Sequence, residues 1–234
     1  MKISGLQKLS LIDYPDKIVC TLFLFGCNFR CGFCHNPELV LKQNEIEYSE
    51  KEILDFLKKR KEQLEGVCIT GGEPLLTLEK DFLKKIKDLG YFVKIDTNGT
   101  NPEKLKEFIS ENLVDYVAMD LKASPEKYDL VAGVEVGINK LEETIKLIVN
   151  SGVGYEFRTT IIRRYHDEEE LKKMYEWILK VVNKKPKRYF LQGFANHGKF
   201  IDNSFNQEPN VFGDYLKKFK PLAEKYFEEV RIRE

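Results

Sequence analysis

Short apolar runs alternate with helix-like stretches along this chain, and this alternation constrains the fold more than any other feature. Runs rich in β-branched and aromatic residues predict strands at 17–25, 66–70, 91–95, 115–119, 155–161, 187–191 and 229–233. Apolar residues at helical spacing predict helices at 49–64, 79–89, 102–112, 138–150, 167–183 and 211–226. Alternation of this kind favours an α/β fold built from βαβ units with a parallel sheet and right-handed crossovers.

Local residues mark several of the predicted helix ends. Ser49 followed by Glu52 forms a capping box, Pro102 suits a first helical turn, and Gly90 suits a helix end. The units predict either part of a (β/α) barrel or an open doubly wound sheet, and the pattern alone does not decide between them. Both architectures place ligands at the carboxyl ends of the strands, so the residues that follow each strand are the candidates for a site.

Charge and hydropathy exclude several classes of protein. The 234 residues contain 38 Lys and Arg against 38 Asp and Glu, so a formal net charge of zero gives no electrostatic case for nucleic-acid binding. No apolar run approaches the ~18 residues that a membrane span needs. The N-terminus lacks the apolar core of about 7–15 residues of a signal peptide. We therefore expect a soluble, cytoplasmic protein with no nucleic-acid or membrane partner.

Three of the five cysteines are clustered. Cys27, Cys31 and Cys34 have the spacing C-x3-C-x2-C and directly follow the strand predicted at 17–25. Three thiolates this close on an irregular loop can converge on one metal centre. Cys20 and Cys68 lie within apolar runs, and we expect both to be buried packing residues.

Iron–sulfur chemistry and zinc are the two candidates for this centre. A structural zinc site needs four closed ligands, but His35 is adjacent to Cys34 and is poorly placed to complete one. A [4Fe–4S] cluster held by three thiolates leaves one iron open to bind another molecule. The sequence favours the cluster, with Phe29 and Phe33 suited to its apolar shell. A zinc-stabilised binding module without turnover is the alternative from a different class.

The sequence TGGEP follows the strand predicted at 66–70. Gly71 and Gly72 permit close backbone approach to a ligand, and Glu73 places a carboxylate at the strand end. The phosphate-binding glycine patterns are absent, so an amino group is a better ligand than a phosphate. The simpler alternative is a tight turn with a solvated glutamate.

Polar residues also follow the next two predicted strands, and one lies inside the third. They are Asp96, Thr97 and Asn98 in DTNG, Asp120 and Lys122 in MDLK, and Arg158 within YEFRTTI. Arg158 interrupts a strand that should be buried on both faces, so it needs an anionic partner. Such a cluster suits a small zwitterion with a ribose: Glu73 for its amino group, Lys122 or Arg158 for its carboxylate, and Asp or Asn for hydroxyls.

These motifs resemble a known superfamily. C-x3-C-x2-C with an aromatic residue before the last cysteine, followed by GGEP, resembles the radical S-adenosylmethionine enzymes. CHNPE, DTNG and DLK resemble the glycyl-radical-enzyme activases, and the opening GLQKLSLIDYPDK is most similar to the longer form of the anaerobic ribonucleoside-triphosphate reductase activating proteins. The resemblance implies one domain over 1–234, with a partial (β/α)6 barrel over about 17–191 and a C-terminal extension over 192–234.

The resemblance also implies roles for the residues named above. Cys27, Cys31 and Cys34 would hold a [4Fe–4S] cluster whose fourth iron is chelated by S-adenosylmethionine. Gly71, Gly72 and Glu73 match the motif that receives the methionine amino group. Asp96, Asp120 and Lys122 are implied to line the cofactor together with an accompanying monovalent cation. Phe33 is implied to lie against the adenine. Thr97, Asn98 and Arg158 are implied to line the cofactor as well.

The implied reaction is the transfer of one electron from flavodoxin or ferredoxin through the cluster to S-adenosylmethionine. The resulting 5′-deoxyadenosyl radical takes a hydrogen atom from a glycine of a partner enzyme. The polar segment 194–210 is a candidate rim for that partner. His197 does not cleanly match the histidine that some activases carry after the sixth strand, and we expect a solvated loop residue. The alternative within the superfamily is an enzyme that acts directly on a small molecule.

Overall fold

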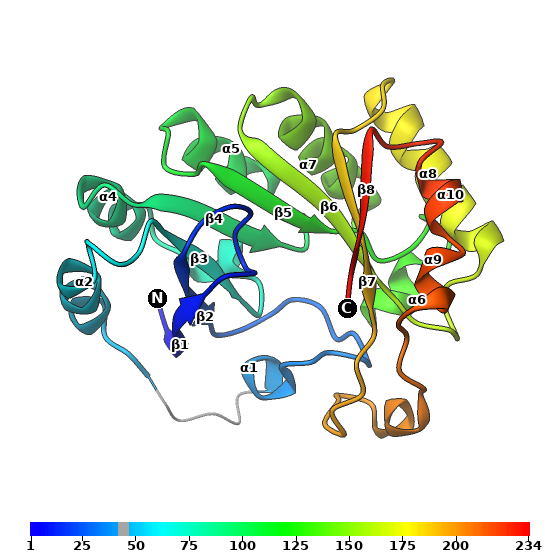
Figure 1. Cartoon of the computed structure of the whole chain (residues 1–234), viewed down its shortest axis with the longest axis horizontal. Coiled ribbons are helices and arrows are strands. Elements are labelled where there is room, and N and C mark those ends of the chain that lie inside the picture. Colours follow the sequence, from blue (N-terminus) through cyan, green and yellow to red (C-terminus); the bar gives the residue numbers. More distant parts are fainter. Residues whose placement is uncertain (42–46) are drawn as a thin grey trace. The chain divides into compact units, whose positions relative to one another are not determined.

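Figure 1 shows the computed structural model of the chain, which describes residues 1–41 and 47–234. The strands are β1 (Ile3–Ser10), β2 (Val19–Leu24), β3 (Gly66–Gly71), β4 (Phe92–Thr97), β5 (Tyr116–Asp120), β6 (Gly154–Ile161), β7 (Arg188–Gly193) and β8 (Glu229–Arg233). The helices are α1 (Pro37–Leu41), α2 (Glu50–Lys59), α3 (Pro74–Thr77), α4 (Lys80–Asp88), α5 (Pro102–Ser110), α6 (Tyr128–Ala132), α7 (Ile138–Asn150), α8 (Glu168–Val182), α9 (Asp214–Lys217) and α10 (Lys220–Ala223), with a 3-10 helix η1 (Asn203–Gln207).

The strands follow one another in the sheet in chain order, from β1 to β8. A doubly wound sheet reverses its strand order where its two halves meet, whereas a barrel winds in one direction. The observed order therefore decides between the two architectures that the sequence left open, in favour of barrel-type winding. The expected α/β fold class is confirmed.

Two compact units divide the chain. The first comprises Met1–Asn28, Glu38–Thr97 and Glu103–Ala118, and the second comprises Phe29–Pro37, Asn98–Pro102 and Met119–Glu234. The single domain over residues 1–234 stays a prediction.

In the first unit, β2, β3 and β4 are parallel, and β1 pairs with β2 in the antiparallel direction. The strand β1 was not predicted, because its middle residues Leu6–Lys8 lack an apolar alternation and are partly or fully exposed. It is the first strand in the order, with β2 as its neighbouring strand and a single bridge from Ile3 to Tyr48, and an edge strand tolerates polar residues.

The helix α2 begins as predicted but ends early. Ser49 and Glu52 form the capping box, in which the Glu52 N–H donates to Ser49 Oγ (3.2 Å) and the Ser49 N–H donates to Glu52 Oε2 (2.8 Å). The expected end at 64 is wrong, because a turn after Lys59 brings the Leu64 N–H to the Arg60 carbonyl (3.0 Å) and directs the chain into β3. The helices α2 and α4 lie side by side in this unit (Figure 1).

In the second unit, β6, β7 and β8 are parallel. The helix α7 has the predicted bounds, and α8 differs from them by one residue at each end. The single helix expected over 211–226 is wrong, because two short helices, α9 and α10, replace it. Pro221 lies in the first turn of α10, where its missing N–H has no helical acceptor to lose, so it favours a new helix start over a helix interior.

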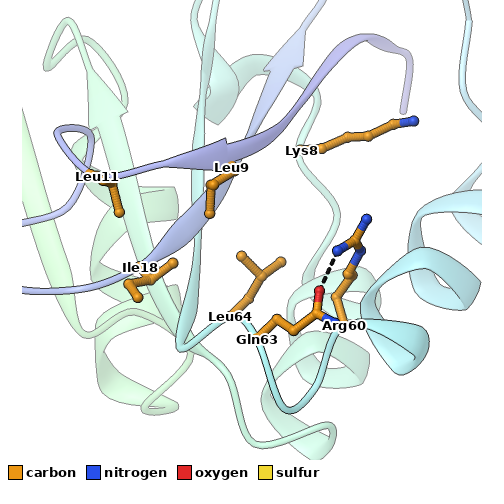
Figure 2. A pocket seen from close by; sticks show the side chains of 7 residues that line it. All are labelled: Lys8, Leu9, Leu11, Ile18, Arg60, Gln63 and Leu64. Carbon is orange, nitrogen blue, oxygen red and sulfur yellow. Dashed lines mark hydrogen bonds between the residues drawn. The ribbon is translucent and has the colours of Figure 1, made fainter.

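A surface pocket lies at the beginning of the parallel strands of the first unit. Figure 2 shows its lining by Lys8, Leu9, Leu11, Ile18, Arg60, Gln63 and Leu64. Ile18 precedes β2 and Leu64 precedes β3, so the pocket is at the opposite end of these strands from Gly71 and Glu73. It contains none of the residues predicted for the site.

Within residues 1–41 and 47–234, no helix has the length and apolar character that crossing a bilayer requires.

The two glycines of TGGEP are required by close backbone packing. Gly71 has φ +120°, and a Cβ there would lie 2.4 Å from the Leu24 backbone. A Cβ on Gly72 would lie 2.0 Å from the Gly26 carbonyl oxygen. The end of β3 and the start of the cysteine loop therefore approach more closely than any side chain permits.

We expect Gly72→Ala to lower the free energy of unfolding by about 1–3 kcal/mol, as for other overpacked sites. The backbone must shift to accommodate the new Cβ, so the melting temperature should fall by several degrees in a thermal unfolding experiment. Gly137→Ala is the matched control, because its Cβ would meet only a Lys140 side-chain carbon at 3.8 Å. Equal melting temperatures for the two variants would contradict the close approach.

Candidate cluster and cofactor site

The cysteine loop leaves the carboxyl end of β2 at Gly26. Its first ligand candidate, Cys27, belongs to the first unit, and Cys31 and Cys34 belong to the second. In the second unit, a turn joins the last two, with the Cys34 N–H donating to the Cys31 carbonyl (3.0 Å). The Arg30 N–H donates to the Ala132 carbonyl at the end of α6 (2.8 Å), which fixes the loop against that helix.

The Cys31 thiol is buried among charged neighbours of the second unit. Its residue is 8 % exposed, and Cys34, Lys122 and Asp120 all influence it electrostatically. Burial raises the pKa of the Cys31 thiol, and the positive charge of Lys122 is the main influence that opposes this rise. Lys122 therefore favours the thiolate, which is the form that binds iron.

Aromatic side chains cover the cysteine loop. Phe33 packs against Tyr165 (ring centroids 6.2 Å apart) and Phe205 (5.9 Å), and Phe29 packs against Tyr128 (6.4 Å). Both phenylalanines are buried, as expected for an apolar shell. Tyr165 and Phe205 were not predicted from the sequence, although the phenylalanines of the polar segment 194–210 were a visible signal.

The segment 194–210, predicted as a rim, packs directly on this loop. The Asp202 N–H donates to the Gly32 carbonyl (3.0 Å), and a Cβ on Gly32 would lie 2.6 Å from the Phe205 ring. His35 Nε2 lies 2.9 Å from the Ala195 carbonyl, and its ring stacks on Phe194 (5.6 Å). The segment therefore supports the cysteine loop, whatever it does for a partner. His197 is exposed, as expected.

Charges of alternating sign lie at the end of β5 and within β6. Arg158 Nε donates to Asp120 Oδ1 (2.6 Å), and Lys122 Nζ lies 3.6 Å from Asp120 Oδ2. The expected anionic partner of Arg158 is thus confirmed. Two further charged residues that the sequence did not predict continue this series. Glu156 is fully buried, and its Oε1 lies 3.9 Å from Arg158 NH1. Arg233 NH1 lies 3.3 Å from the same Glu156 oxygen.

His166, which sequence reasoning also missed, holds the backbone that carries Lys122. Its Nδ1 accepts from the Ile162 N–H (3.0 Å), so its Nε2 carries the proton that is donated to the Lys122 carbonyl (2.8 Å). Thr159 Oγ1 donates to the neighbouring Leu121 carbonyl (2.7 Å). The loop after β5 is thereby fixed before any ligand binds.

In the first unit, Glu73 is held inside the turn that follows β3. Its N–H donates to the Gly26 carbonyl (2.8 Å), and its side chain is fully buried. Oε1 accepts from the Leu75 N–H (3.1 Å), which caps α3, and from Thr97 Oγ1 (2.8 Å). The alternative of a solvated glutamate is wrong, and Thr97 contacts Glu73 at the end of β4.

Asn98 and Asp96 differ in what they contact. Asn98 Oδ1 accepts from the Thr100 N–H (3.1 Å) and from Thr100 Oγ1 (2.7 Å), so this oxygen shapes the turn after β4. Asp96 lies beside Lys94, a buried lysine that the sequence reasoning missed although it interrupts an apolar strand. The role of Asn98 in cofactor binding stays a prediction.

The donor set suits an iron–sulfur cluster. All five cysteines are thiols, and Cys20 and Cys68 are fully buried, as predicted. Burial raises the pKa of Cys20 to about 12, so it stays protonated. In the part of the chain that the structure describes, no three His, Cys, Asp or Glu side chains are arranged around a single metal ion. The three-thiolate site therefore stays a prediction. The burial of Cys31 and the positive charge of Lys122 near it are consistent with that prediction.

Comparisons with known proteins show the family of this chain. A family model described as the Radical SAM superfamily matches residues 21–178. A protein of Methanocaldococcus jannaschii, named as a glycyl-radical enzyme activating enzyme, is 37 % identical over 99 % of this chain and 95 % of its own length. The pyruvate formate-lyase-activating enzyme of Clostridium pasteurianum is 30 % identical over 72 % of each chain.

The fold agrees as well. The crystal structure of a radical SAM methyltransferase from Sphaerobacter thermophilus superimposes with a TM-score of 0.72 at 14 % identity, over 96 % of this chain and 68 % of that one. The chain belongs to the radical SAM superfamily and to its family of glycyl-radical enzyme activating enzymes, so it is an enzyme whose cofactors are a [4Fe–4S] cluster and S-adenosylmethionine.

Proposed function

We propose that this enzyme generates a glycyl radical on a partner enzyme. The observation that carries the proposal is the 37 % identity to the M. jannaschii activating enzyme over nearly the full length of both proteins. Identity over the whole of two chains supports a shared reaction more strongly than shared cluster and cofactor motifs do. The chemistry supplied by the bound cofactors is one-electron cleavage of S-adenosylmethionine to methionine and a 5′-deoxyadenosyl radical, which takes a hydrogen atom from a glycine Cα.

The residues of the second unit would bind the cluster and orient S-adenosylmethionine. Cys31 and Cys34, together with Cys27, would hold the cluster, and Lys122 would favour the Cys31 thiolate. Arg158 and Lys122 would attract the methionine carboxylate, and Asp120 between them would limit their motion. The Phe33 ring would exclude water beside the adenine.

The residues of the first unit would receive the methionine amino group. Gly71 and Gly72 would allow the backbone to approach the ligand, and Glu73 would accept the hydrogen bonds of the amino group. Thr97 and the Leu75 N–H hold the Glu73 carboxylate in one orientation before binding, which lowers the entropy lost when the ligand is bound.

The proposed partner rests on the resemblance of the N-terminal sequence, and the proposed electron donor rests on the resemblance to the superfamily as a whole. We propose the anaerobic ribonucleoside-triphosphate reductase as the glycyl-radical enzyme, and flavodoxin or ferredoxin as the donor. A cytoplasmic location is part of the proposal, because thiols at all five cysteines suit a reducing compartment.

Cys31→Ala is expected to abolish cluster binding and all cleavage of S-adenosylmethionine. Iron and sulfide analysis of anaerobically purified protein, with the broad absorbance near ~400 nm that iron–sulfur proteins show, measures the loss. Cys20→Ala is the matched control, since it removes a buried thiol that has no proposed ligand role. Four irons per chain in Cys31→Ala, or equal loss in both variants, would refute the ligand assignment.

Glu73→Gln is expected to keep the cluster and to weaken S-adenosylmethionine binding by about 1.5–3 kcal/mol, the loss of a charged hydrogen-bond acceptor. This is about a 10- to 150-fold rise in Kd by calorimetry. The amide oxygen can still cap α3, so the melting temperature should change little. Glu62→Gln, at an exposed position of the same unit, controls for the loss of charge. Wild-type affinity in Glu73→Gln would show that the residue is misassigned.

The partner proposal is tested by electron paramagnetic resonance. Reduced enzyme, S-adenosylmethionine and the reductase from the same source should give the doublet of a glycyl radical, and omission of any one component should remove it. Absence of the doublet with every glycyl-radical enzyme of that source, together with turnover of a small molecule, would favour the alternative of a small-molecule substrate.

A further inference from the structure

Lys94 is a buried cation in the middle of β4. It is 1 % exposed, and its chain neighbours Val93 and Ile95 are fully buried. Lysine is almost never fully buried unless it is paired, because removing an ammonium from water without a partner is strongly unfavourable. Lys94 therefore needs an anionic group beside it.

That anion is Asp96. The two residues are separated by one position on a strand, so their side chains leave the same face, and the Lys94 ammonium bonds Asp96 Oδ1. Cys68 is the residue of β3 that pairs with Lys94 in the strand register. Its Sγ lies 3.8 Å from Lys94 Nζ and 3.8 Å from Asp96 Oδ1. The three side chains form one buried cluster within the first unit.

Along β4 this cluster directly precedes Thr97, which contacts a residue proposed to receive the methionine amino group. Asp96 is followed directly by Thr97, whose hydroxyl donates to Glu73 (2.8 Å). The family resemblance implies that Asp96, together with Asp120 and Lys122, lines the methionine and an accompanying monovalent cation. Here an ammonium already contacts the Asp96 carboxylate, and a second cation on the same oxygen would be repelled by the first.

We propose that Lys94 is the resident counter-ion of Asp96 and takes the place of a monovalent metal cation, so that S-adenosylmethionine binding needs neither K⁺ nor Na⁺. The inference rests on the proposed location of the cofactor beside Asp96. Lys94 acts through Asp96 and is thus a positioning residue. Its ammonium fixes the orientation of the carboxylate.

The test is calorimetric titration of S-adenosylmethionine into the oxidised, cluster-containing enzyme in K⁺, Na⁺ or tetramethylammonium buffers of equal ionic strength. The wild-type Kd should agree within about twofold in all three. Lys94→Met keeps an apolar stem but leaves the ammonium position open. Its Kd should rise at least about fivefold in tetramethylammonium and return to within about twofold of wild type in K⁺ or Na⁺.

Lys87→Met is the matched control. Lys87 is also paired with an aspartate of the first unit, Asp115 (2.7 Å), but Asp115 precedes β5 and has no proposed role in the site. Its affinity should be that of the wild type in every salt. If the melting temperature shows that Lys94→Met does not fold, Lys94→Gln removes the charge and keeps a hydrogen-bond donor.

Three results would overturn the inference. They are a wild-type enzyme that loses fivefold or more affinity without K⁺ and Na⁺, a Lys94→Met enzyme that binds normally in tetramethylammonium, and a Lys94→Met enzyme that is weakened equally in all three salts. Asp96→Asn separates this failure from failure of the proposed site. Normal binding by Asp96→Asn would remove Asp96 from the site, whereas weak binding by Asp96→Asn with normal binding by Lys94→Met would overturn the role of Lys94 alone.

Discussion

The hydrogen bond from the Glu73 N–H to the Gly26 carbonyl joins the two motifs on which the site depends. Gly26 begins the cysteine loop and Glu73 ends the glycine turn after β3, and the bond is 2.8 Å long. Because the same carbonyl lies where a Cβ of residue 72 would be, glycine is a steric requirement there. The relation between the first thiol and the buried carboxylate is therefore set by backbone packing and does not depend on flexible side chains.

Oppositely charged side chains lie beside one another at the strands of both units. In the first unit Lys94 is paired with Asp96, and in the second the sequence of charges runs through Lys122, Asp120, Arg158, Glu156 and Arg233. Pairing compensates part of the cost of desolvation. It also fixes each group before the cofactor binds, which is the condition for a site that orients a zwitterion without reorganising.

The sequence predicted the periodic parts of the fold and the composition of the strand ends. The helices α7 and α8 and the capping box of α2 depend on residues close in the chain, so their local patterns were sufficient. Arg158 was expected to have an anionic partner, because an arginine inside a buried strand requires one. The carboxyl-end rule for parallel sheets likewise made Glu73, Asp96 and Asp120 candidates without knowledge of their contacts, and their roles in the site stay predictions.

What the sequence did not predict depends on contacts between distant residues. The strand β1 exists because it pairs with β2, although its own residues are largely polar. Phe205 covers Phe33 from a polar segment that was predicted as a rim for the partner, and Arg233 reaches Glu156 from the last strand. Lys94 was visible as an interruption of an apolar run, but its partner could be identified only once the side chains were placed.

The central claim is that three thiolates leave one iron of a four-iron cluster open for S-adenosylmethionine. Mössbauer spectroscopy of ⁵⁷Fe-labelled, oxygen-free enzyme tests it most directly, because the method distinguishes irons that have different ligands. The spectrum of one iron in four should change when S-adenosylmethionine is added, and the other three should stay as they were. A spectrum without a four-iron centre, or one in which all four irons are indifferent to S-adenosylmethionine, would contradict the claim.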